Sequence, residues 1–121
     1  MLLELNGIDV ECIIGERVEE RTRTQRLLVD VRLEIGDAAA ESDALSDTVD
    51  YAAFTEKVRA ALVAAKCRMI ERAAKVVCDL CREDPKVHAA TVRIVKAGAV
   101  AHLASAAVTY SSPSYGIIHT P

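Results

Sequence analysis

Residues 27–35 have an apolar side chain at every second position, with Asp30, Arg32 and Glu34 between the later ones, and no other segment limits the fold as strongly. The segment reads LLVDVRLEI, and its apolar positions are Leu27, Val29, Val31, Leu33 and Ile35. Side chains of a strand point alternately to opposite faces, so this pattern predicts a half-buried β-strand. A shorter apolar run from Ile8 to Ile14 can pair with it as the first half of an antiparallel hairpin.

Two central segments repeat apolar residues at helical spacing. The first begins at about Tyr51, after a polar stretch whose Ser, Asp and Thr side chains can cap a helix. The second begins near Met69 and ends before Pro85, because proline cannot continue a helix. We therefore expect two helices between the first hairpin and the remainder of the chain.

Strand-like composition returns at residues 90–96 and 104–110, and the Gly98 region between them is expected to form a turn. The predicted order is ββααββ, an α+β domain in which two helices cover one face of a four-stranded antiparallel sheet. Such a sheet has two open edges, which favour pairing with another copy. We expect one domain over residues 1–110 and a C-terminal tail, 111–121, that is a loop or a docked extension.

The charge and hydropathy of the chain argue against several classes of function. A net charge of -3 gives no overall attraction to nucleic acid or to an anionic membrane. Glu4, Asp9 and Glu11 interrupt the first residues, so these do not read as a signal peptide, and no apolar run approaches the length of a membrane span. These features predict a cytoplasmic location.

The four cysteines raise the question of a metal site, but the sequence does not favour one. Cys78 and Cys81 have zinc-like spacing, but a zinc site needs a second pair of ligands. The remaining cysteines and the histidines are scattered along the chain. We predict reduced thiols, with Cys78 and Cys81 buried on one helix face, and no metal site.

Four sequence segments resemble, in order, those of the dihydroneopterin aldolase family. The first is IIG-x-x-x-x-ER-x-x-x-Q, from Ile13 to Gln25, and the second is Asp47-Thr48-Val49-Asp50-Tyr51. The third is Ile70-Glu71-Arg72-Ala73-Ala74, and the fourth is Lys96-Ala97-Gly98-Ala99-Val100. Each segment alone is weak, but four in register over residues 6–110 are a specific signal.

The resemblance implies the tunnelling fold, in which subunits join their sheets edge to edge into a ring. The assembly would be an oligomeric barrel, a tetramer or an octamer of two stacked rings, with pterin sites between neighbouring subunits. The implied reaction is retro-aldol cleavage of 7,8-dihydroneopterin to glycolaldehyde and 6-hydroxymethyl-7,8-dihydropterin, a folate precursor. The substrate ring accepts the electron pair, so the resemblance implies a lyase without metal, cofactor or Schiff base.

The resemblance also implies roles for individual residues. Lys96 would be the general acid/base, Tyr51 a proton relay supplied across the subunit boundary, and Glu20 the acid that orients the polyol or a water. Glu71, with Ile70, would bind the pterin edge, whose adjacent N–H donors suit a carboxylate; Glu20 and Tyr51 would also contact substrate. Each residue has a plainer reading: a helix-dipole partner for Glu71, a solvated lysine, a half-buried tyrosine and a solvated loop glutamate.

Two alternatives remain open at this stage. Ala97 stands where the family usually has proline, a departure shared with the related dihydroneopterin triphosphate epimerases, which would need local positive charge. Arg17, Arg21, Arg23 and Arg26 cluster beside Glu20 and are a hypothesis for phosphate contact, although a solvated basic stretch is the plainer reading. The alternative from another class is a non-catalytic oligomeric pterin-binding or scaffold protein, because fold alone does not fix function.

Overall fold

The computed structural model describes residues 1–113, and its elements follow the predicted ββααββ order. The strands are β1 (Leu2–Cys12), β2 (Gln25–Ile35), β3 (Val87–Val100) and β4 (Leu103–Ser112). The α-helices are α1 (Ala38–Ser42), α2 (Tyr51–Ala65) and α3 (Ile70–Arg82). Two 3-10 turns, η1 (Val18–Arg21) and η2 (Leu45–Asp47), complete the list. The α+β class is therefore confirmed.

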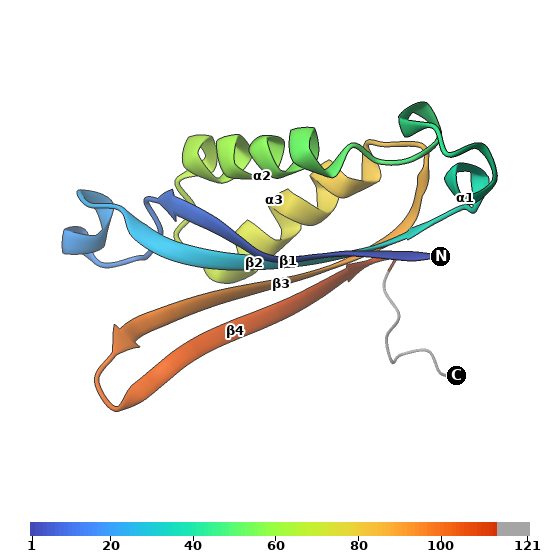
Figure 1. Ribbon diagram of the computed structural model, residues 1–121. Helices are drawn as coiled ribbons and strands as arrows, with labels where there is room; N and C mark the ends of the chain where they lie inside the picture. The colour runs from blue at the N-terminus through green and yellow to red at the C-terminus, as the bar shows by residue number, and fades with distance from the viewer. Residues whose placement is uncertain (114–121) are drawn as a thin grey trace.

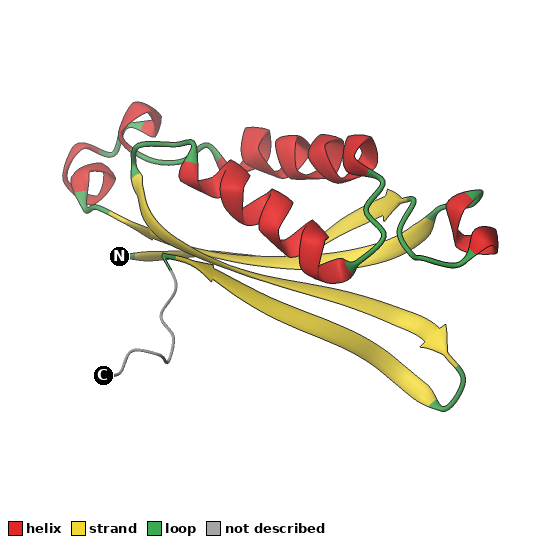
Figure 2. Ribbon diagram, turned by 180° about the vertical axis from the view of Figure 1, so that it is seen from behind, coloured by secondary structure: helices red, strands yellow, loops and turns green. Residues whose placement is uncertain are grey.

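The four strands form one antiparallel sheet in the order β1-β2-β3-β4. Helices α2 and α3 lie on one face of this sheet, and the opposite face is bare of helices (Figures 1 and 2). The order of the strands in the sheet is their order along the chain, with the helices inserted between β2 and β3. In the register of β2 with β3, Lys96 pairs with Leu27.

The core lies between the helices and the sheet face that they cover. The alternating residues of β2 supply its floor, since Leu27, Val29, Val31 and Leu33 are completely buried. Val58 and Leu62 of α2 and Val77 of α3 pack onto them. Cys78 and Cys81 are free, buried residues of α3, as the sequence indicated. Burial of this apolar face is what holds the helices on the sheet.

The hairpin turn lies in the expected region between the two strand segments, but it follows Gly98 rather than including it. The hairpin reverses at Ala101 and His102, and Gly98 lies inside β3, where the register shifts between Ala97 and Val100. Its φ of +67° shows that the glycine serves this irregularity, because a positive φ is costly for other residues. His102, at φ 68°, takes the left-handed position of the actual turn.

The polar stretch before α2 also holds more structure than the sequence predicted. It forms the short elements α1 and η2, neither of which contains a buried residue. The expected cap is present, because the Asp50 carboxylate accepts a hydrogen bond from the Ala53 N–H at 3.2 Å. Local capping was thus predictable, whereas two short exposed turns without an apolar stripe were not.

The sheet ends at β1 on one side and at β4 on the other, which leaves two strand edges open as expected. β4 continues past residue 110, since Ser111 pairs with Thr91 and Ser112 with Ala90. The rest of the expected tail, residues 114–121, lies outside the described residues. Within residues 1–113, no helix is both long and apolar enough to cross a bilayer.

Candidate functional site

The strongest candidate for chemistry is an ion pair between Glu20 and Lys96, two residues far apart in the sequence. The Lys96 Nζ donates to Glu20 Oε2 at 2.8 Å, and the side chains are only 11% and 12% exposed. Lys96 projects from β3 toward the helix-covered face, while η1 brings Glu20 to it. The plain readings of a solvated lysine and a solvated loop glutamate therefore do not hold, because nearly buried charges require partners.

The Glu20 carboxylate is held by donors on both of its oxygens. Gln25 Nε2 donates to Oε2 at 3.1 Å, beside the Lys96 bond, and the Arg17 N–H donates to Oε1 at 3.2 Å. The hydrogen bond from Lys96, followed by those from Gln25 and Arg17, lowers the pKa of Glu20 to about 2. Glu20 is consequently ionised near neutral pH and serves as an acceptor rather than an acid.

Gly15 makes room for this carboxylate. A Cβ added to Gly15 would lie 2.3 Å from Glu20 Cδ and 2.5 and 2.6 Å from its two oxygens. The residue also has φ +131°, a conformation that side-chain-bearing residues rarely adopt. The glycine of the first sequence segment is thus required by a close approach as well as by its backbone conformation.

Gln25 links the Glu20–Lys96 pair to the main chain at Ile14, shortly after β1. Its Nε2 donates to the Ile14 carbonyl oxygen at 2.7 Å in addition to Glu20. One amide group therefore fixes the carboxylate relative to the main chain next to Gly15. Gly15 and Gln25, both in the first sequence segment, thus both contact the carboxylate of Glu20. Their spacing in the sequence did not reveal these contacts.

The arginines proposed for phosphate contact have different surroundings. Arg21 donates to main-chain carbonyl oxygens, and Arg26 donates to Asp9 Oδ1 at 2.9 Å. Two of the four guanidiniums are therefore occupied within the chain, which weakens the phosphate hypothesis. The remaining two, Arg17 and Arg23, are exposed.

Glu71 and Ile70 begin α3 at the same end of the fold as this pair. The Gly15 N–H donates to the Cys67 carbonyl oxygen at 3.2 Å, which joins the loop carrying Glu20 to the segment just before α3. Met69 provides no side-chain cap, so Glu71 is an exposed acid in the first turn of a helix with free N–H donors. The carboxylate is open to a ligand there.

Tyr51 is the predicted site residue that the single chain does not bring to the others. It is the first residue of α2, whereas the end of α2 adjoins the Glu20 loop (Figure 1). The helix has 15 residues and is therefore about 22 Å long. Tyr51 is 61% exposed, so its ring is available for contact outside its own chain.

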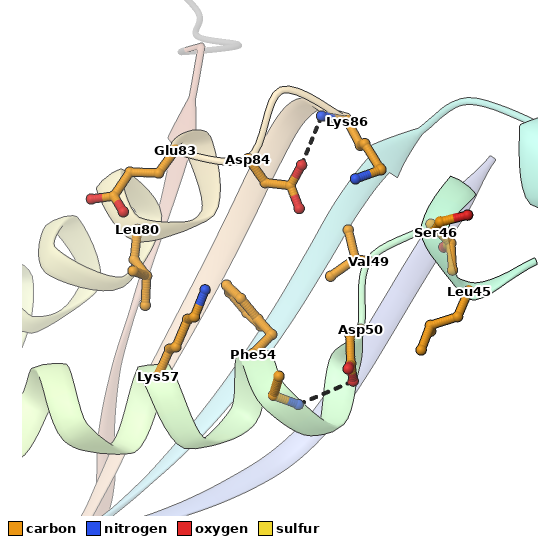
Figure 3. Close-up of a pocket in the computed structure, with 12 residues that line it drawn as sticks. Leu45, Ser46, Val49, Asp50, Phe54, Lys57, Leu80, Glu83, Asp84 and Lys86 are labelled. Atoms are coloured by element: carbon orange, nitrogen blue, oxygen red, sulfur yellow. Dashed lines mark hydrogen bonds between the residues drawn. The ribbon is translucent and has the colours of Figure 1, made fainter.

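A cavity of about 400 Å³ lies near the beginning of α2 (Figure 3). Val49, Phe54 and Leu80 contribute apolar walls, and Lys57 and Lys86 line it as well. Its lining includes the motif residues directly before Tyr51 but not Glu20, Glu71 or Lys96. The candidate groups thus occupy two separate ends of the molecule.

The chain's thiols are poorly suited to ligand chemistry. Burial raises the pKa of Cys12 to about 11 and that of Cys81 to about 12, so both are protonated thiols near neutral pH. Over residues 1–113, no group of three or more His, Cys, Asp and Glu side chains is arranged to hold a metal ion.

Comparisons with known proteins agree on one family. A family model described as FolB, dihydroneopterin aldolase, matches residues 3–111. A dihydroneopterin aldolase of Streptococcus pyogenes is 40% identical over 84 residues, covering 68% of this chain and 71% of that protein. The crystal structure of Escherichia coli dihydroneopterin aldolase in complex with neopterin has a TM-score of 0.85 at 27% identity, covering 92% of this chain and 97% of that one.

A second solved structure, a Vibrio cholerae protein assigned to the dihydroneopterin aldolases, has a TM-score of 0.86 at 25% identity. The match covers 92% of this chain and 95% of the Vibrio cholerae chain. Because all of these matches extend over most of the chain, the similarity concerns the whole ββααββ unit.

Replacing Gly15 by alanine is expected to displace the Glu20 carboxylate and break its bond to Lys96. The pKa of Glu20 should then rise from about 2 toward its ordinary range, as measured by NMR titration of its carboxyl carbon. Gly7→Ala is the matched control, since Gly7 also has a positive φ, +72°, but no atom lies within 4 Å of an added Cβ. A Glu20 pKa near 2 in Gly15→Ala would contradict the close-approach argument.

The lowered pKa of Glu20 also predicts a pH dependence of stability. Its folded value, about 2, is below the ordinary value of 4.5, so its contribution is complete above pH 4.5 and is lost as the pH falls toward 2. Wild type should therefore lose its advantage over Glu20→Gln in that window, as measured by urea unfolding. Glu19→Gln, at the exposed neighbouring carboxylate, should follow wild type throughout. A gap between wild type and Glu20→Gln that widens on acidification would refute the assignment.

Proposed function

The chain belongs to the dihydroneopterin aldolase family, and from that premise we propose that it cleaves 7,8-dihydroneopterin to glycolaldehyde and 6-hydroxymethyl-7,8-dihydropterin. The enzyme is a lyase. The observation that carries the proposal for the site is the nearly buried Glu20–Lys96 pair, which supplies a positioned proton donor and a fixed carboxylate. Both side chains come from the sequence segments that resemble the family.

The bond to be broken joins the first two carbons of the substrate side chain. Loss of the proton from the hydroxyl on the second carbon lets its oxygen form the carbonyl of glycolaldehyde. The electrons of the broken bond move into the ring's adjacent carbon–nitrogen double bond, and a proton then adds to the first carbon. Protein groups need only align the substrate and move protons. General acid–base catalysis of this kind raises the rate by about 10²–10⁴-fold.

We assign the proton transfer to Lys96 and the orienting role to Glu20. A carboxylate whose pKa is about 2 is a poor proton acceptor near pH 7, which argues against Glu20 as the base. Its negative charge instead fixes the direction of the Lys96 ammonium and offers acceptor oxygens to the polyol or to a water. Lys96 accepts the hydroxyl proton as the neutral amine, after its own ammonium proton has passed to a water, and it then returns a proton to the first carbon.

Glu71 is proposed to hold the pterin ring. Its exposed carboxylate at the start of α3 can accept two N–H donors from the pterin edge, and Ile70 contributes backbone and apolar contact beside it. The uncapped N–H groups of this helix end also favour an electron-rich ligand edge. The crystal structure of the Escherichia coli relative in complex with neopterin supports a pterin ligand.

We propose that Tyr51 acts in the site of a neighbouring subunit. Its position at the opposite end of α2 from Glu20, and its 61% exposure, support a role outside its own chain. The two open edges, β1 and β4, offer the backbone groups for joining sheets into a ring, either as a tetramer or as an octamer of two rings. Each interface would then combine the Glu71 end of one chain with the Tyr51 end of the next.

The proposed mechanism uses neither a metal nor a lysine imine. We propose that the amine of Lys96, placed by its bond to Glu20, transfers protons and forms no covalent bond to the substrate. The ring of the substrate provides the electron sink that a metal or imine supplies in other aldolases. Free buried cysteines suit a reducing compartment, and we propose that the protein acts in the cytoplasm.

The epimerase alternative shares the cleavage step and differs only in re-addition of the aldehyde on the other face. Occupation of the Arg21 and Arg26 guanidiniums within the chain favours the unphosphorylated substrate. A non-catalytic scaffold would have no use for a nearly buried acid–amine pair, whose burial costs free energy. Aldol cleavage is therefore the preferred function.

The test is an assay of the purified protein with 7,8-dihydroneopterin, with and without a chelator, monitoring glycolaldehyde and the epimer. We expect cleavage that the chelator leaves unchanged, and no adduct at Lys96 when borohydride is added during turnover. Lys96→Ala should reduce kcat by about 10²–10⁴-fold. Lys75→Ala, at an exposed lysine paired with Asp79, should retain activity. Loss of activity with chelator would contradict the metal-free mechanism, and full turnover by Lys96→Ala would contradict the assignment of Lys96.

The shared site predicts complementation between two inactive variants. Tyr51→Phe retains Lys96, and Lys96→Ala retains Tyr51, so a mixed interface can combine one intact residue from each chain. Co-assembly in equal amounts should restore about a quarter of wild-type activity by random pairing. Activity that stays at the sum of the two separate variants would show that Tyr51 does not act across an interface.

A further inference from the structure

The Arg21 guanidinium bonds main-chain carbonyl oxygens of two segments that are far apart in the sequence. Its Nη1 donates to the carbonyl oxygens of Gly15 at 2.9 Å and Cys67 at 3.1 Å, and its Nη2 donates to that of Lys66 at 2.7 Å. All three acceptors are main-chain atoms. The side chain thus connects the loop that carries Glu20 with the connection between α2 and α3, 45 and 46 residues away.

These acceptors explain why arginine suits the position. Lys66 is the C-cap of α2, with φ 45°, and the last carbonyls of a helix lack partners within the helix. A planar guanidinium can satisfy several such oxygens at once and is favoured by the negative end of the helix dipole. The Gly15 N–H reinforces the same junction through its bond to the Cys67 carbonyl oxygen.

The junction lies between the two halves of the proposed site within one chain. On one side, Glu20 directly precedes Arg21 and binds Lys96. On the other side, the α2–α3 connection leads within a few residues to Glu71 in the first turn of α3. The spacing between the proton-transfer pair and the proposed ring-binding carboxylate therefore depends on this contact.

We propose that Arg21 is a positioning residue, which sets the Glu20–Lys96 pair at the working distance from Glu71 without touching the substrate. The inference rests on the proposed function and extends it to a residue outside the reacting groups. Small misplacements of reacting groups lower rates by up to about 10²-fold even when ligand binding persists. Loss of Arg21 should accordingly affect turnover more than pterin affinity.

The chain offers a matched control for a contact that merely joins the two segments. Arg68 donates to Glu16 Oε1 at 2.9 Å and so links the same connection to the same loop. That pair is on the surface, at 60% and 58% exposure, where ion pairs contribute little. Arg68→Met removes a guanidinium of the same size from the same junction but leaves the three carbonyl contacts in place.

The experiment compares Arg21→Met, Arg21→Lys and Arg68→Met with wild type in three measurements: kcat and KM on 7,8-dihydroneopterin, the Kd of neopterin, and urea unfolding. We expect both Arg21 variants to lose about 10–100-fold in kcat while the neopterin Kd changes by less than about threefold. Arg68→Met should change kcat by about twofold or less. Arg21→Lys keeps the charge but not the planar fork, so it should remain folded and still lose turnover.

Three results separate the possibilities. Arg21→Lys with wild-type kcat would overturn the inference while leaving the proposed function intact. A fall in kcat that equals the unfolded fraction of the variant at the assay temperature would also overturn it, because the arginine would then be only a structural contact. Failure of the wild type itself to release glycolaldehyde would instead refute the proposed function.

Discussion

The ion pair between Glu20 and Lys96 is the constraint around which the rest of the site is arranged. Two charges at only 11% and 12% exposure carry a desolvation cost that requires close partners on both sides. Glu20 is the partner of Lys96, and the Glu20 carboxylate also accepts from the Gln25 amide and the Arg17 N–H in the space left by Gly15. A nearly buried ion pair adds little net stability compared with apolar side chains of similar size, so its presence here supports a role in chemistry.

The fold was largely predictable because it depends on local patterns. The alternation in residues 27–35 predicted β2, and helical spacing with capping residues and a proline stop predicted α2 and α3. The exact position of the β3–β4 turn was not predictable, because a glycine in a strand-like segment can serve either a turn or a bulge, and only the pairing with β4 decides between them. Short exposed elements such as α1 contain no buried residues, so they produce no apolar pattern in the sequence.

The sequence proposed residues for the site but gave no information on their contacts. Resemblance to the family named Glu20, Glu71 and Lys96, yet no spacing rule brings together residues separated by 76 positions. The occupation of Arg21 by main-chain carbonyls was equally hidden, because an arginine in a basic stretch reads as solvated or as anion-binding. The position of Tyr51 at the far end of α2 is geometric information that only the folded chain carries.

The length of α2 affects when a newly synthesised chain becomes active. On the proposed arrangement, a newly made chain carries an amine and a carboxylate at one end and a phenol at the other, about 22 Å of helix apart, and cannot close a complete site by itself. Catalytic competence is then a property of protein concentration as well as of folding. A dilute pool of correctly folded single chains would be inert, and assembly itself would be the step that switches it on.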